Sequence, residues 1–144
     1  MTLIQFEDTT TPTDLTGGIT AAAFTVANDT STEADLDNVN IILLDGAGGG
    51  YATVGDAVDA MEDGGSFSLK HQSNLAEDDA FLFAYENSTT GLVTIAIANV
   101  TGADDNSGTS ATFVDGTLNG EDLATLTGIT DVTSLAAADF NFIT

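Results

Sequence analysis

The sequence predicts a mainly β protein, a single domain of β-sandwich or β-roll type with one or two short helices. Three observations predict it. Short apolar segments recur at close spacing, the segments between them are rich in Gly, Asp, Asn and Thr, and only one stretch has clear amphipathic helical spacing. The chain, residues 1–144, fits one domain, and a hydrophobic content of 42% is sufficient for a core.

The first part of the chain is predicted to contain three strands. They are expected over residues 3–7, 22–27 and 39–44, with a polar, acidic loop over residues 28–38 before the third. The third strand ends in the glycine-rich loop 45–50. This loop lacks the Gly-Lys-Ser/Thr ending of a P-loop, so we interpret it as a tight strand-to-helix connection.

A helix is predicted directly after this loop. Thr53 precedes Asp56 by three residues, an arrangement close to a capping box. One apolar stripe at i, i+3, i+4 and i+7 follows, made of Val54, Ala57, Val58 and Met61. Gly64 and Gly65 are expected to end the helix.

The strongest strand signal is a hairpin over residues 81–85 and 92–98, joined by a turn at 86–91. Both segments are apolar on both faces, which predicts a central position in a sandwich or beneath the helix. An acidic loop at 102–110 and a strand at 111–114 are expected next.

The last part of the chain is predicted to begin with a capped helical turn near residues 119–126. A final strand is expected over residues 140–143, where Phe, Asn, Phe and Ile alternate.

The net charge of −22 excludes several function classes. Lys70 is the only Lys or Arg, and His71 is the only histidine. Nucleic acids and anionic membranes would repel such a surface, so neither is an expected partner. No stretch approaches the roughly 20 apolar residues of a membrane span, so membrane insertion is not expected. The carboxylates require external screening by salt or by divalent cations.

Calcium is the cation that the sequence favours, because it prefers carboxylate, carbonyl and amide oxygens. Three stretches supply candidate ligands: Asp104, Asp105 and Asn106; Asp115, Glu121 and Asp122; and Asp45 with Asp56. None has the ligand spacing of an EF-hand loop, and for each stretch a solvated acidic loop is the alternative.

Catalysis is not expected. The chain has no cysteine, a single histidine and no nucleophile-elbow motif. Adjacent carboxylates such as Asp78 and Asp79 are too common in this sequence to indicate acid–base chemistry. We therefore predict that the protein is not an enzyme.

Two segments carry a resemblance to a known family. Residues 135–144, in which Asp139 precedes Phe140, Phe142 and Ile143, resemble the uncleaved C-terminal signal of type I secretion. The hairpin over residues 79–97 is similar to hairpins of RTX-like calcium-binding surface proteins of cyanobacteria and marine bacteria. The glycine-rich, Asp-bearing nonapeptide repeats of that family are absent.

The resemblance implies an extracellular or cell-surface location, calcium as a cofactor, and an export role for a tail over residues 130–144. The first residues lack the basic and long apolar regions of a cleavable signal peptide. This agrees either with export by a route that reads no such signal or with a protein that stays in the cytoplasm.

Two functions from different classes remain. The first is a structural protein of the cell surface or extracellular matrix that assembles with itself, into filaments or sheets, with calcium support. The second is a salt-adapted binding module or a viral decoration protein. For the first, the segment 1–12 is a candidate strand donor: its apolar part begins at Leu3, ends at Phe6, and either closes its own sheet or pairs with a second copy.

Overall fold

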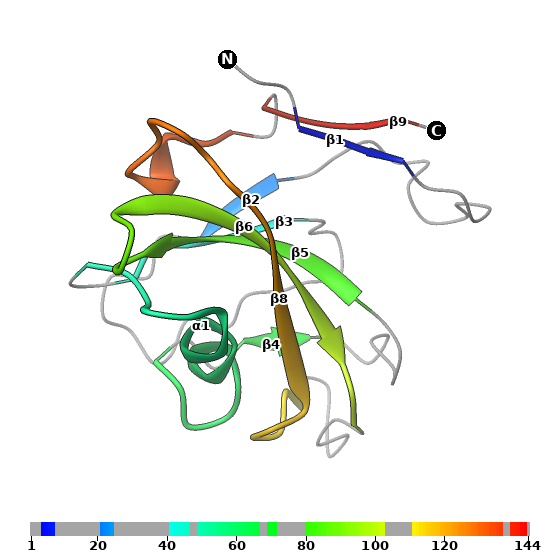
Figure 1. The fold of residues 1–144 in the computed structure, drawn as a ribbon. Helices are drawn as coiled ribbons and strands as arrows, with labels where there is room; N and C mark the ends of the chain where they lie inside the picture. The colour runs from blue at the N-terminus through cyan, green and yellow to red at the C-terminus, as the bar shows by residue number, and fades with distance from the viewer. Residues whose placement is uncertain are drawn as a thin grey trace.

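The structure, a computed structural model, describes residues 4–7, 21–24, 41–46, 49–66, 69–71, 80–102, 111–136 and 139–143. This part of the chain is mainly β, with one α-helix and one 3-10 turn among its elements (Figure 1). The predicted mainly β class with one or two short helices is confirmed.

The central element is a mixed, five-stranded sheet. Its strands are β2 (Ala21–Phe24), β3 (Ile41–Leu44), β5 (Ala80–Asn87), β6 (Leu92–Val100) and β8 (Leu118–Thr125), in the order β2-β3-β5-β6-β8. Neighbours are parallel from β2 to β5 and antiparallel from β5 to β8. The predicted sandwich or roll is not confirmed, because within the described residues this main sheet is open.

The helix α1 (Val54–Met61) begins as the sequence predicted. Thr53 Oγ1 accepts a hydrogen bond from the backbone N–H of Asp56 (3.2 Å), and Asp56 Oδ2 accepts one from the backbone N–H of Thr53 (2.9 Å). These two bonds are a complete capping box. The helix lies in the connection between β3 and β5, and parallel neighbours require a long crossover connection of this kind.

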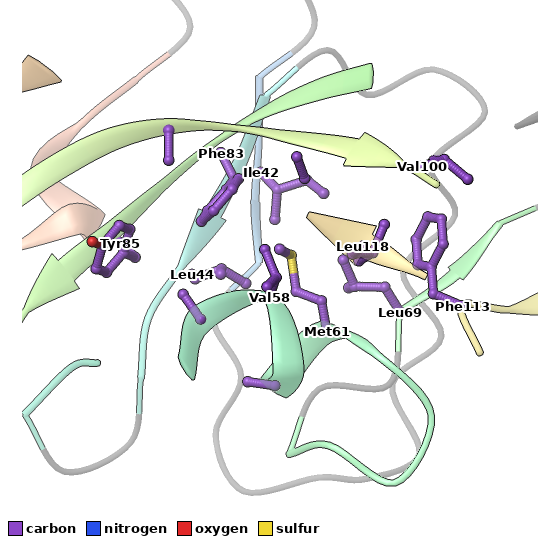
Figure 2. Close-up of a cluster of buried hydrophobic side chains, with 14 residues drawn as sticks. Ile42, Leu44, Val58, Met61, Leu69, Phe83, Tyr85, Val100, Phe113 and Leu118 are labelled. Atoms are coloured by element: carbon purple, nitrogen blue, oxygen red, sulfur yellow. The ribbon is translucent and has the colours of Figure 1, made fainter. Parts of the chain in front are cut away.

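Side chains of α1 cover one face of the sheet. Figure 2 shows Val58 and Met61 lying against residues of the sheet such as Ile42. The buried residues of this first core are Ile42, Leu44, Ala57, Val58, Ala60, Met61, Leu69, Phe83, Tyr85, Ala96, Ala98, Val100, Phe113 and Leu118. The predicted hairpin, now β5 and β6, lies centrally beneath the helix, as its two apolar faces required.

The opposite face has a second core. Its buried residues are Ile41, Leu43, Ala84, Val93, Ile95, Val132, Leu135 and Phe140. Of the last three, Val132 lies in the 3-10 turn η1 (Val132–Ser134), Leu135 directly follows it, and Phe140 is the first residue of β9 (Phe140–Ile143). Residues near the end of the chain therefore cover the face that α1 leaves open.

Two smaller strand pairs complete the described fold. β1 (Ile4–Glu7) pairs with β9 in parallel, with Ile4 opposite Phe140 and Glu7 opposite Ile143 (Figure 1). β4 (Lys70–His71) pairs with β7 (Ala111–Thr112) in the antiparallel sense. The predicted first, second, third and final strands are thus present over the residues that the structure describes. The predicted acidic loop at 28–38 lies outside them, as do all residues but Gly102 of the acidic loop predicted at 102–110.

The helical turn predicted near residues 119–126 is wrong. These residues form β8, which pairs with β6 along the edge of the sheet. Asn119 and Asp122 have the spacing of a helix cap, but Gly120 disfavours a helix and the edge of β6 offers a row of backbone partners. The strand absorbs one extra residue in a β-bulge opposite Ile95 and Ala96. The strand predicted at 111–114 is also shorter, since β7 ends at Thr112.

At Gly120 the backbone of β8 lies close to the side chains of α1. A Cβ atom added at Gly120 would lie 2.7 Å from Val54 Cγ2 and 2.9 Å from Val58 Cγ1. Both valines are stiff β-branched residues, so the helix itself would have to move. The absence of a side chain at Gly120 therefore permits this close approach of helix and strand.

We predict that Gly120→Ala lowers the free energy of unfolding by about 1–3 kcal/mol, the usual cost of overpacking. Urea denaturation followed by circular dichroism measures this change. The matched control is Gly55→Ala, where the added Cβ would meet its nearest neighbour, Thr53 Oγ1, at an ordinary 3.5 Å. Because Gly55 lies in α1, this control should be neutral or stabilising, by up to about 1 kcal/mol. Equal stability of Gly120→Ala and the natural chain would contradict the packing described here.

Candidate functional site

The best-defined polar feature is the buried carboxylate of Glu62, which is 1% exposed. Glu62 directly follows α1. Its Oε2 accepts a hydrogen bond from the backbone N–H of Gly116 (2.8 Å), and its Oε1 accepts one from that of Leu118 (2.6 Å). A single side chain thus connects the end of α1 to the turn that precedes β8. The backbone N–H of Asp63 strengthens the same junction by donating to the carbonyl of Phe113 (2.7 Å).

Glu62 was not among the predicted site residues, although the sequence contains one signal for it. Glu62 lies four residues after Val58 and so falls on the apolar stripe of α1. A carboxylate at such a position must be buried with hydrogen-bond donors or must end the helix, and Glu62 does both.

A second polar cluster surrounds Tyr85, whose side chain is fully buried. The Tyr85 hydroxyl donates to Asp122 Oδ1 (2.9 Å) and accepts from Asn87 Nδ2 (3.4 Å). Burial is the largest cause that raises the pKa of Tyr85, to about 12, and Asp122 adds to it. Burial likewise raises the pKa of Tyr51, which meets the Tyr85 ring edge-on at 6.4 Å. The cluster fixes β8 to β5 across β6.

The predicted ligand Asp45 is the first residue of the glycine-rich loop, and the predicted ligand Asp56 lies after the loop, in the first turn of α1. Asp45 is half-buried directly after β3, whereas Asp56 is exposed. Asp56 Oδ2 also accepts from the Thr53 hydroxyl (2.8 Å), in addition to the Thr53 backbone. Its position in the sequence is therefore accounted for by the helix start.

The glycine-rich loop is, as predicted, a connection from β3 to α1. Where it passes β5, the N–H of Tyr51 donates to the carbonyl of Glu86 (2.8 Å) and the N–H of Ser88 donates to the carbonyl of Tyr51 (2.9 Å). Gly50 has φ +81°, and a Cβ there would collide with the Glu86 carbonyl. Close backbone approach therefore explains the glycine at this position.

The predicted ligands Asp115, Glu121 and Asp122 are all exposed. Asp115 lies in the turn that Glu62 holds, while Glu121 and Asp122 lie on β8. Among the residues that the structure describes, no three His, Cys, Asp or Glu side chains come together as a metal site. Asp104, Asp105 and Asn106 lie outside the described residues, so the calcium prediction for that stretch stays a prediction.

The strand edges are the remaining candidate for function. Among the described strands, β2 and β8 have one neighbour each in the main sheet, and β1 and β9 have only each other. The β8 edge contains a β-bulge, carries the carboxylates of Glu121 and Asp122, and exposes 46% of Leu123. Charges and bulges are the usual protection of an edge against pairing. β1 has one carboxylate, Glu7, and β9 has none.

Comparisons with known proteins add no relative: protein-family models, curated proteins and solved structures gave no match to this chain. Within the described residues, none of the helical segments has the length and apolar character required to cross a membrane.

The Glu62 junction gives a testable prediction. Glu62→Gln keeps the shape of the side chain but places an amide N–H₂ against a backbone donor, so we expect a loss of about 1–3 kcal/mol in the free energy of unfolding. The matched control is Glu121→Gln, the same substitution at an exposed position of β8. It should change stability by no more than about 0.5 kcal/mol. Urea denaturation compares the two variants, and equal stabilities would contradict a structural role for Glu62.

The pKa of Tyr85 predicts how stability depends on alkaline pH. The folded-state pKa of about 12 exceeds the usual tyrosine pKa of 10.0, so the unfolded chain releases this proton first. The contribution is fully present below pH 10 and is lost as pH rises toward 12. Tyr51→Phe leaves Tyr85 as the single tyrosine, and its ultraviolet absorbance should then show a tyrosinate midpoint near 12. A midpoint near 10 while circular dichroism still shows a folded chain would contradict the buried geometry.

Proposed function

We propose that this chain is an acidic structural protein of the cell surface or extracellular matrix that assembles with itself by strand pairing, with calcium support. The observation that carries the proposal is the β1–β9 pair, a two-stranded parallel sheet separate from the main sheet. Two strands alone form a marginal sheet, and parallel pairing is the weaker kind. Such a marginal pair opens readily, and a β1 strand released from it can pair with a second copy of the chain.

The distribution of charge supports a requirement for cations during assembly. Subunits at −22 repel one another, and the chain has one Lys or Arg to oppose 23 carboxylates. Divalent cations reduce this repulsion and coordinate carboxylates from two subunits at once. The stretch Asp104, Asp105 and Asn106 remains our first candidate for this role, and Asp115, Glu121, Asp122 and Asp45 are further candidates.

We also propose a sandwich-like arrangement of the sheets and an extracellular location of the protein. The second core lies between the main sheet and the segment of β9, because Phe140 packs with Ile41 and Leu43. This packing supports a sandwich-like arrangement of the main sheet and the β1–β9 pair. The export role of residues 130–144 and the extracellular location rest on the resemblance to RTX-like, type I-secreted proteins. Since Phe140 is buried, that tail would serve as a structural element as well.

The second candidate is a salt-adapted binding module. The observation that favours it is the exposure of most described carboxylates, including Asp59, Asp63, Asp115 and Glu121. A solvated acidic surface of this kind requires screening alone, without bound calcium. Sodium chloride would then replace calcium completely.

We predict that calcium stabilises the fold beyond the effect of ionic strength. Calcium at 100 times its dissociation constant would add about 2.7 kcal/mol to the free energy of unfolding. For a domain of this size the melting temperature would rise by several degrees. Thermal unfolding in calcium, and in sodium chloride of equal ionic strength, measures the difference. If sodium chloride gives the whole shift, the salt-adapted alternative is correct.

The assembly itself is tested by negative-stain microscopy of the concentrated protein in millimolar calcium. We expect filaments or sheets that dissociate when a chelator removes the calcium. A strictly monomeric protein at high concentration, with and without calcium, would contradict the proposed function.

A further inference from the structure

We propose that the strand that receives β1 in the assembly is β9 of a second copy, in the same parallel register that β1 and β9 have within one chain. This inference rests on the proposed self-assembly and adds the partner strand and its register. Each copy would exchange its first strand with the next copy, so that every junction repeats the β1–β9 pairing.

β9 is fixed to the body of the molecule by its own residues. Phe140 is 4% exposed and packs in the second core with Ile41, Leu43 and Val132. Directly before it, Asp139 Oδ2 accepts a hydrogen bond from the backbone N–H of Ala136 (2.9 Å), which fixes the turn that leads into β9. The anchoring of β9 therefore includes contacts that do not involve β1, and an acceptor strand must have this property.

β1 is connected to the molecule in a different way. Its only strand partner in the described sheets is β9, over four residue pairs from Ile4–Phe140 to Glu7–Ile143. Residues 8–20 join it to β2. A chain of this length spans at most about 45 Å, whereas a strand of four residues is about 13 Å long. The covalent connection thus permits β1 to pair with β9 of its own chain or of an adjacent one.

Electrostatics favours β9 over the edge of β8 as the acceptor. Glu121 and Asp122 lie in the middle of β8, and the β-bulge interrupts its register. A strand from another subunit of charge −22 would meet these carboxylates there. The β9 sequence, Phe-Asn-Phe-Ile, has no charge, and the register aligns its two Phe positions with Ile4 and Phe6.

Exchange of β1 between copies propagates. One copy offers one β1 and one β9, which are different surfaces, so the contact is heterologous and continues unless its rotation closes a ring. Pairing within one chain competes at an effective concentration on the order of millimolar. Growth should therefore require a high protein concentration together with screening of the charge.

The test uses the fact that the chain has no cysteine. Gln5 and Asn141 are register partners. Neighbouring strands lie about 4.8 Å apart, which is within the range of about 4.4–6.8 Å between Cα atoms that a disulfide spans. Two single variants, Gln5→Cys and Asn141→Cys, are made with tags of different mass, mixed, assembled in calcium and oxidised. We expect a disulfide-linked heterodimer as the main product, dispersed by reductant, because only exchange brings these two positions together from different molecules.

Two further mixtures identify the acceptor. Gln5→Cys with Thr133→Cys, an exposed position of η1, is the control for random contact and should link at a background level. Gln5→Cys with Ala22→Cys probes the outer edge of β2. If only the Ala22 mixture links, the inference is overturned while the proposed function stands. If the natural chain does not assemble at all, both are wrong.

A second measurement does not depend on mixing. The double variant Gln5→Cys/Asn141→Cys, oxidised at high dilution, locks β1 onto β9 of its own chain. Circular dichroism confirms that the locked chain is folded. In a sedimentation assay we expect almost none of the locked chain to sediment as an assembly. Assembly should return when a reductant breaks the disulfide. Assembly of the locked chain at the level of the natural one would overturn strand exchange.

Discussion

The central strands of the sheet are apolar on both faces, and the rest of the fold follows from this constraint. All four residues of β3 are buried, two toward α1 and two toward the segment that contains η1 and Phe140. A sheet of this kind is stable in water only when both faces are covered. Among the described residues, a helix of eight residues covers the first face, and a short segment with η1 and Phe140 covers the second. Both of these covering segments are short, so the hydrogen bonds that attach them to the rest of the fold are important for holding them in place.

These attachments are carboxylates that accept hydrogen bonds from backbone N–H groups. Glu62 binds the N–H groups of Gly116 and Leu118 and thereby connects α1 to the turn before β8. Glu86 accepts from the N–H of Val132 (3.2 Å) and connects β5 to η1. The Asp131 carboxylate accepts from both the hydroxyl and the N–H of Thr133, and these bonds lower its pKa.

A chain with one Lys or Arg has few cations with which to pair its acids. Several of the described acids accept hydrogen bonds from backbone donors instead, at the helix start, turns and junctions: Asp56, Glu62, Glu86, Asp131 and Asp139. This explains how a domain of charge −22 can still use individual carboxylates to hold its elements together. The exposed carboxylates outside these bonds repel one another, and this repulsion links assembly to salt and calcium.

Local signals in the sequence were sufficient to predict several elements of the fold. The spacing of Thr53 and Asp56 predicted the capping box, and the two-faced apolar pattern predicted that the hairpin is central. β8 was mispredicted because its residues are mostly exposed, and an edge strand is determined by the neighbour to which it binds. The role of Glu62 depends on Gly116 and Leu118, more than fifty residues away, and no local pattern reveals such a pairing.

The sequence showed that the candidate calcium ligands are acidic, but it did not show how they are arranged in space. Asp56 and Asp122 accept hydrogen bonds within the fold, from Thr53 and Tyr85. Ligand geometry depends on which loops the fold brings together, and spacing along one stretch does not determine this.

The central claim is that β1 and β9 form the junction between copies. Hydrogen–deuterium exchange tests it directly by comparing the backbone amides of the dilute monomer with those of the calcium-assembled protein. Within one chain the marginal β1–β9 pair opens by local fraying, whereas in the assembly its opening separates two copies. The pair should therefore exchange rapidly in the monomer and become strongly protected in the assembly, while the β2 and β8 edges stay unchanged. Protection that appears along β8 or β2 instead, with β1 and β9 still exchanging rapidly, would contradict the account.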